Sequence, residues 1–188
     1  MPSSQVAALF VSGRTIYRHL PGVEVFDKRR DARQFAGGMS VVAHPPCRHW
    51  SRLRHQAGAN ATAAEIEEEK RLGVWAVEQV MRWGGVLEQP AGSLLWDACQ
   101  LPRCGDYSDA FCFTEYIEQS WFGFPTPKAT WLLVCGVPRR LVNVPTFQLR
   151  AKSLASFSDL NSFERSRTMR PMAEWLCQLA RASWWGLR

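Results

Sequence analysis

Short apolar runs, each ended by residues that break a strand, most constrain how this chain can fold. Three of them open the sequence, at residues 6–11, 23–26 and 40–43. Apolar runs of about four to eight residues between turn signals are typical of buried strands. The third run leads into Pro45-Pro46, and two consecutive prolines cannot continue a central strand. The chain must therefore leave the sheet at that point.

Helical patterns alternate with these runs. Thr62 and Glu65 form a capping-box sequence that begins the clearest helix, and Gly84-Gly85 ends it after Trp83. A second amphipathic pattern covers residues 171–183. Three more strands are expected, at residues 86–87, 111–119 and 130–135. The first of these is expected to break at residues 88–90, and a loop at residues 123–127 joins the other two.

Strands that alternate with helices predict an α/β fold in a single domain over residues 1–188. We expect a mainly parallel sheet with flanking helices and a C-terminal antiparallel strand pair. Ligands of such sheets bind outside the carboxyl ends of the strands. Here those ends carry the polar and strand-breaking residues of the chain: Ser12-Gly13, Asp27, residues 44–47 and residues 88–90. Their convergence is the first indication of a functional site.

Charge and cysteine content suggest partners and location. The net charge of +6 favours a nucleic acid or nucleotide as partner, although a solvated basic surface explains it equally well. The same two explanations apply to the C-terminal arginines at positions 165, 167, 170, 181 and 188. With no secretory leader pattern and no apolar run that could span a bilayer, we expect a cytoplasmic chain that does not contact membranes. Its six cysteines are then expected to be reduced, with Cys135 and Cys177 in the core.

Cys47 is the strongest candidate for chemistry. It follows a proline-rigid turn at a strand end, which would hold the sulfur in place and exposed. Arg48, Arg52 and Arg54 lie close in sequence and would favour a thiolate, the form needed for covalent attack on an electron-poor base. The alternative is a buried, inert cysteine. Glu88 could hydrogen-bond a ring nitrogen near that sulfur, or it could be an ordinary turn carboxylate.

The order of short motifs resembles the catalytic core of DNA cytosine-5 methyltransferases. Pro45-Pro46-Cys47 with Trp50-Ser51 resembles their Pro-Pro-Cys loop, and Glu88-Gln89-Pro90 resembles their Glu-Asn-Val motif. Residues 123–136 are similar to their Gly-Val-Pro-Gln stretch and the strand after it. Phe10 to Gly13 resembles the start of the cofactor loop, and Asp27 falls where the family places an acid on the cofactor ribose. The likeness covers roughly residues 7–136 and is strongest to small phage or prophage relatives.

The resemblance implies a Rossmann-like, methyltransferase-type fold and a mechanism. Cys47 would add to carbon 6 of a flipped-out cytosine, and Glu88 would stabilise the protonated ring nitrogen 3. Carbon 5 would then accept a methyl group from S-adenosylmethionine. The residues implied to hold that cofactor are Phe10, Ser12, Gly13, Asp27 and Pro45. The residues implied to contact the substrate are Arg48, Ser51 and Lys128.

Three departures from the family keep a second hypothesis open. Arg14 and Thr15 replace the glycines that let the cofactor approach the backbone. Only Lys128 remains of a motif that carries two arginines in the family. The stretch between Gly136 and the last helix is too short for a target-recognition domain. The chain could therefore be an inactive binding module on a methyltransferase scaffold, such as a phage protein that engages a host factor or nucleic acid.

Metal binding and base stacking are weaker alternatives. Zinc ligands could come from residues of two segments: His44, Cys47, His49, His55, Cys99, Cys104 and Cys112. The sequence has no Cys-x-x-Cys pair, so we expect no metal site. Trp75 and Trp83 are expected in the core. Trp50, Trp96 and Trp121 lie beside the motif loops, where they could stack on bases or simply pack.

Overall fold

The computed structural model describes residues 5–52, 54, 61–106, 111–144 and 159–183. These residues form one six-stranded sheet with the strand order β2-β1-β3-β4-β6-β5. The strands are β1 (Val6–Leu9), β2 (Val23–Phe26), β3 (Ser40–Ala43), β4 (Gly85–Pro90), β5 (Cys112–Glu118) and β6 (Ala129–Cys135).

The sheet is mixed. β1 pairs in parallel with β2 and β3, and β3 pairs in parallel with β4. β6 runs antiparallel to both of its neighbours, β4 and β5. The expected C-terminal antiparallel pair is thus confirmed, whereas the expectation of a mainly parallel sheet is wrong. The connection from β5 to β6 contains only a 3-10 turn and a loop, which is too short for a parallel crossover, so the second strand must return antiparallel.

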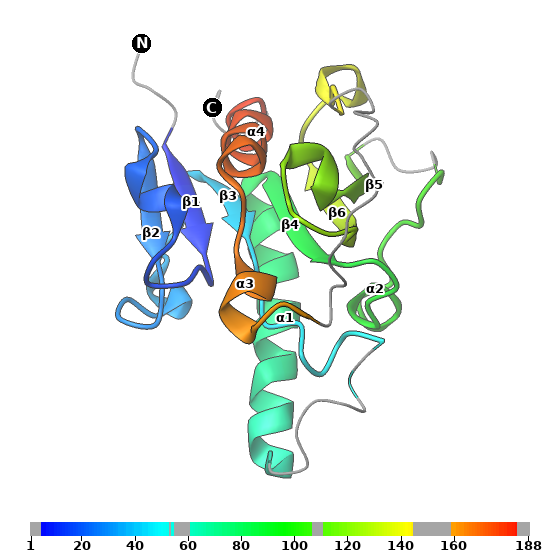
Figure 1. The fold of residues 1–188 in the computed structure, drawn as a ribbon. Helices are drawn as coiled ribbons and strands as arrows, with labels where there is room; N and C mark the ends of the chain where they lie inside the picture. Colours follow the sequence, from blue (N-terminus) through cyan, green and yellow to red (C-terminus); the bar gives the residue numbers. More distant parts are fainter. Residues whose placement is uncertain (1–4, 53, 55–60, 107–110, 145–158, 184–188) are drawn as a thin grey trace.

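Helices cover both faces of the sheet (Figure 1). The α-helices are α1 (Ala63–Trp83), α2 (Leu95–Ala98), α3 (Ser162–Ser166) and α4 (Arg170–Arg181). The 3-10 turns are η1 (Ile16–His19), η2 (Ala32–Gln34), η4 (Gln119–Phe122) and η5 (Arg139–Leu141). The predicted capping box is confirmed, because Thr62 and Glu65 each bond the backbone N–H of the other. In the part of the chain described, no helix has the length and apolar character needed to cross a membrane.

The core has two layers that follow from the alternation of side chains along each strand. Val42 and Val86 face the layer that contains buried residues of α4. Val41 and Leu87 face the other layer, with Val77 and Val80 of α1. α1 and α4 therefore pack on opposite faces, and the carboxyl edge of the parallel strands is left for loops.

β4 is longer than the sequence predicts. It continues through Glu88 to Pro90, although the sequence predicted a strand that breaks at residues 88–90. β3 pairs with β4 only as far as Leu87, and beyond that residue the ladder continues on the β6 side alone. Pro90 lacks an N–H donor and is tolerated there because the strand has become an edge.

Two of the cysteines expected to be free form a disulfide. Cys112 and Cys135 lie directly opposite each other in the β5–β6 register, with Cα atoms 4.2 Å apart. Closely spaced pairs of this kind bring the two sulfurs within bonding reach. The expectation of reduced thiols is therefore wrong at these positions. Cys177 is free and buried, as expected.

Candidate functional site

The candidate site lies where strand order reverses. β2 and β3, the next strands in the chain, pair on opposite sides of β1, so the connections diverge between β1 and β3. Such a switch point leaves a crevice outside the carboxyl ends of the strands. His44, the first residue after β3, is fixed there because its backbone N–H donates to Leu9 O at 3.0 Å.

The loop that carries Cys47 is anchored at several points. Cys47 O accepts hydrogen bonds from the backbone N–H groups of Trp50 (3.2 Å) and Ser51 (2.9 Å). Trp50 O accepts from Leu94 N at 2.8 Å, and the indole is only 6% exposed. The ring lies so close to Gly73 of α1 that a Cβ on that residue would be 2.5 Å from Trp50 Nε1. Trp50 therefore packs in the core and fixes the loop, while the Cys47 side chain is exposed.

Pro45 ties this loop to β4. Its carbonyl oxygen accepts a 2.7 Å hydrogen bond from Gln89 Nε2, and Ser93 Oγ donates to Gln89 Oε1 at 3.2 Å. Gln89 is adjacent to Glu88, so this contact brings the Cys47 loop and the Glu88 strand together. Pro45 is buried in this contact.

Glu88 is the centre of a buried polar network. Its side chain is 13% exposed, and Oε2 lies 3.2 Å from His44 Nδ1. Gln119 Nε2 donates to the other oxygen, Oε1, at 2.9 Å and to Thr130 Oγ1 at 3.0 Å. The Tyr17 hydroxyl lies 2.8 Å from His44 Nε2. The network joins residues that follow or belong to five different strands: β1, β3, β4, β5 and β6.

The network keeps Glu88 ionised and Tyr17 neutral. Burial alone would raise the pKa of Glu88, but the hydrogen bond from His44, the charge of Lys128 and the hydrogen bond from Gln119 outweigh it, so the pKa is lowered. Burial is also the main reason that the pKa of Tyr17 is raised well above its usual value, and the negative charge of Glu88 adds to it. Tyr17 thus remains a hydroxyl that can donate to His44.

Cys47 titrates in the opposite direction from the sequence-based expectation. Although its side chain reaches solvent, the surrounding protein removes part of its hydration, and this raises the thiol pKa. The negative charge of Glu88 raises that pKa further, while Lys128 lowers it. Neither Arg48 nor Arg52 counteracts these effects. The expected thiolate stabilised by neighbouring arginines is therefore wrong for the chain without a ligand, because burial and then the acid from β4 both raise the thiol pKa.

The three residues expected to contact substrate have different positions. Lys128 precedes β6, and its charge acts on both Cys47 and Glu88. Its Nζ donates to Arg165 O at 2.9 Å, which holds it across the site. Arg48 is exposed and Ser51 is partly buried, and both belong to the loop that carries Cys47. The structure thus brings Lys128 to the two candidate catalytic residues from a distant strand.

The residues expected to hold S-adenosylmethionine do gather, but they do not present a cofactor site. The Asp27 side chain is 2% exposed, and Arg18 Nη2 pairs with its Oδ2. Its Oδ1 accepts from the backbone N–H groups of Arg29 (2.8 Å) and Arg30 (3.2 Å). Burial would raise the Asp27 pKa, but these hydrogen bonds and Arg18 lower it. A carboxylate so enclosed cannot reach a ribose hydroxyl.

The other cofactor candidates support the same conclusion. Gly13 O accepts from Arg18 Nε at 3.2 Å, so this side chain bridges Gly13 and Asp27. Ser12 is exposed on the same loop. Phe10 has a positive φ of 60° and packs edge-on against Trp75, with ring centroids 5.8 Å apart. The arrangement does not fit S-adenosylmethionine.

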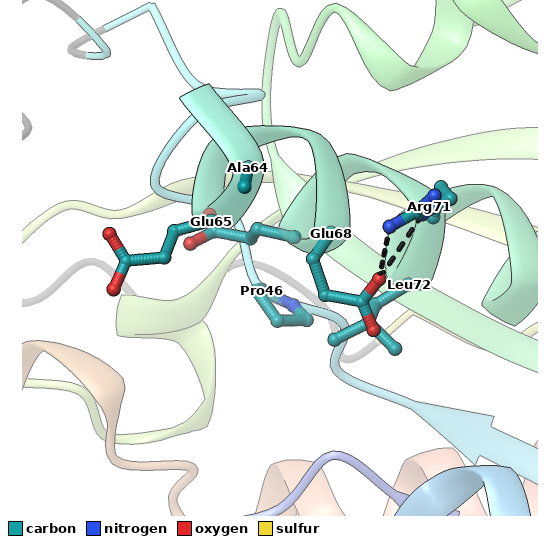
Figure 2. Close-up of a pocket in the computed structure, with 7 residues that line it drawn as sticks. Pro46, Ala64, Glu65, Glu68, Arg71 and Leu72 are labelled. Carbon is teal, nitrogen blue, oxygen red and sulfur yellow. Dashed lines mark hydrogen bonds and ion pairs between the residues drawn. The ribbon is translucent and has the colours of Figure 1, made fainter. Parts of the chain in front are cut away.

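A pocket next to the Cys47 loop has an acidic lining, and the metal alternative gains no support from the described residues. The pocket in Figure 2 lies between Pro46 and the first turns of α1, and three glutamates line it. One of them, Glu68, is held by Arg71, whose Nη2 donates to Oε2 at 2.7 Å. An acidic lining disfavours phosphate. Among the described residues, no three His, Cys, Asp or Glu side chains could share a metal ion, and His55 lies outside them.

The sequence did not identify Tyr17 and Gln119 as site residues. Neither belongs to a motif, and each reaches Glu88 or His44 only through the fold. Gln119 lies at the end of the expected strand 111–119, which was a signal, whereas Tyr17 lies beside no expected strand end. Comparisons with models of protein families, with curated proteins and with solved structures found no match for this chain.

Proposed function

We propose that this chain is a cytosine-directed enzyme with a Rossmann-like, methyltransferase-type scaffold, acting on nucleic acid or nucleotides through Cys47. The observation that carries the proposal is the meeting of Cys47, Glu88 and Lys128 at one edge of the sheet, close enough for their charges to act on one another. The three residues come from separate segments, and the resemblance assigns a role in base chemistry to each. The antiparallel pair of β5 and β6, which completes the sheet, supports the scaffold assignment.

The residues of this chain account for the addition step. The Cys47 sulfur bonds to carbon 6 of the base, and the electron pair of the 5,6 double bond moves to position 5, which accepts a proton. The thiol proton balances this addition, so no oxidant or reductant is required. Ring nitrogen 3 takes up a second proton from solvent, and ionised Glu88 accepts a hydrogen bond from the resulting N–H. A carboxylate has about four acceptor sites, and His44 and Gln119 use two of them.

An oligonucleotide that contains 5-azacytosine tests this step directly. In this base a nitrogen replaces carbon 5 and takes the proton after the sulfur adds, so an adduct forms without a methyl donor. We expect a covalent complex on denaturing gels, with the mass of protein plus oligonucleotide. Cys47→Ser should abolish it, and Glu88→Gln should slow it by about 10²-fold or more.

Cys104→Ser is the matched control, since Cys104 is a second exposed free cysteine. This variant should form the adduct at the wild-type rate. An adduct that persists in Cys47→Ser would show that the sulfur was assigned wrongly. No adduct with folded wild-type protein would show that the chain does not add to cytosine.

The second candidate function is a binding module without cofactor, and the enclosure of Asp27 favours it. Titration calorimetry with S-adenosylmethionine addresses this point. The enclosed carboxylate predicts no measurable heat of binding. Absence of both this heat and the 5-azacytosine adduct would favour the binding module over the enzyme.

A further inference from the structure

Basic side chains surround the place where the resemblance puts the cofactor. They come from the loop after β1 and from the segment after β2, and all are exposed. The members of this group, here named the Asp27 basic cluster, are Arg14, Arg18, Lys28, Arg29 and Arg30. The proposed chemistry at Cys47 does not use any of them.

The buried Asp27 carboxylate contacts several members of the cluster. Arg18 is held by Asp27 and by Gly13 O, and the backbone N–H groups of Arg29 and Arg30 donate to Asp27. A Cβ on Gly13 would lie 3.8 Å from Asp27 Oδ2, so the two segments are in close contact. Asp27 therefore holds together the two segments that carry the five exposed basic residues.

The cluster carries an excess of positive charge. Asp27 offsets Arg18, and Glu24 pairs with Arg30 at 3.2 Å. Within the described part of the chain, no salt bridge involves Arg14, Lys28 or Arg29. Three cations thus remain available to a ligand on this surface. S-adenosylmethionine carries a net positive charge, so this surface repels it.

We infer that the Asp27 basic cluster binds backbone phosphates of a single-stranded nucleic acid, and that the same strand presents its cytosine to Cys47. Guanidinium groups suit phosphate because their N–H donors match its oxygens in pairs. The position of the cytosine at Cys47 rests on the proposed function, whereas the phosphate contacts do not depend on it.

The strand order places the Asp27 basic cluster and the Cys47 loop close enough for one ligand to contact both. β2, β1 and β3 are neighbours, so the ends of β2 and β3 are separated by two strand spacings, on the order of 10 Å. Nucleic acid with a rise of about 3.4 Å per nucleotide covers this distance in a few nucleotides. Single strands are the favoured form because extruding a base from a duplex requires unpairing and unstacking.

The test measures fluorescence anisotropy of a labelled, cytosine-containing single-stranded oligonucleotide over a range of salt concentrations. Each phosphate contact contributes about −0.7 to the slope of log K against log salt for single strands. Lys28→Gln/Arg29→Gln should therefore reduce the magnitude of that slope by about 1.4 and weaken binding at low salt about tenfold or more.

Arg82→Gln/Arg140→Gln is the matched control. It removes the same charge from exposed positions at the amino edge of the parallel strands, in the last turn of α1 and in η5. The control should retain most of the wild-type slope. Equal losses in the two double variants would overturn the inference, because bulk charge would then explain binding. Deoxycytidine monophosphate that binds as tightly as the oligonucleotide would overturn nucleic acid as the partner.

Failure of this inference can be told apart from failure of the proposed function. Cys47→Ser should bind the oligonucleotide with the wild-type slope while forming no adduct. If binding depends on Lys28 and Arg29 but the wild-type protein forms no adduct, the phosphate-binding role of the cluster is supported and the proposed enzyme is rejected. An adduct that forms normally in Lys28→Gln/Arg29→Gln, with unchanged binding, would reject the cluster alone.

Discussion

Gly73→Ala is the sharpest test of how the Cys47 loop is held. In an exposed helix interior this change stabilises a protein by about 1 kcal/mol, because alanine has the higher helix propensity. Gly73 is instead buried in α1, where its Cβ would lie 2.5 Å from Trp50 Nε1, 3.2 Å from Trp50 Cε2 and 3.3 Å from Leu95 Cδ1. The first two of these atoms belong to a rigid ring, so a small side-chain adjustment cannot relieve the contact.

The expected sign follows from comparing two magnitudes. Overpacking a well-packed core costs about 1–3 kcal/mol. Set against the propensity gain, Gly73→Ala should lower the free energy of unfolding by about 1 kcal/mol, or the melting temperature by about 2–4 °C. Urea unfolding followed by far-UV circular dichroism measures the change. Glu67→Ala, at an exposed position of the same helix, should be nearly neutral.

A double-mutant cycle identifies the cause. Trp50 Nε1 has no hydrogen-bond partner among the described residues, so Trp50→Phe removes buried ring surface but no hydrogen bond. In that background the methyl group that Gly73→Ala adds has more room, and the two changes should couple favourably by about 1 kcal/mol. Gly73→Ala that stabilises the wild-type protein by about 1 kcal/mol would refute the reasoning.

Three further predictions concern titration and cross-linking. Because burial and Glu88 raise the Cys47 pKa, the pH midpoint of its alkylation by iodoacetamide should lie above the usual thiol value of about 8.5. Glu88→Gln should shift this midpoint to lower pH, and Lys128→Gln should shift it to higher pH. No shift in either variant would contradict the assignment. Because the Glu88 pKa is lowered, its interactions stabilise the protein above about pH 4.3, and this stability is lost as pH falls through the folded-state pKa. The difference in free energy of unfolding between wild type and Glu88→Gln should therefore shrink on acidification. Urea unfolding from about pH 7 to about pH 3 measures this difference. Cys112→Ala/Cys135→Ala should lose about 3 kcal/mol for opening a loop with a sequence separation of 23, and reducing agent should destabilise wild type but not this variant.

The sequence predicted most of the sheet because its strands are short and bounded by breakers. β2 and β3 match the expected residues 23–26 and 40–43. β1 ends two residues early, because Phe10 adopts a φ of 60° and leaves the strand. A bulky residue with positive φ is rare, and apolar character alone gave no sign of it.

Features that depend on which strands pair were beyond the reach of the sequence. The Cys112–Cys135 disulfide requires the β5–β6 register, and the length of β4 requires knowing that its pairing with β3 ends at Leu87. Periodicity gives the type of an element but not its neighbours. The same gap explains why Gln119, placed by η4, could not be assigned to Glu88.

The direction of the Cys47 pKa was missed for a related reason, and its physical cause bears on the proposed chemistry. Sequence neighbours pointed to arginines, whereas the thiol pKa is raised first by burial and then by Glu88, while Lys128 lowers it. Without a ligand, the ionised Glu88 opposes a second negative charge on Cys47, so the thiol stays protonated. A cytosine that takes up a proton from solvent at ring nitrogen 3 and donates that N–H to Glu88 offsets the negative charge and removes part of the opposition. Under the proposed chemistry, base binding and thiolate formation are therefore coupled, and Glu88→Gln should make Cys47 more readily alkylated while making the 5-azacytosine adduct slower to form.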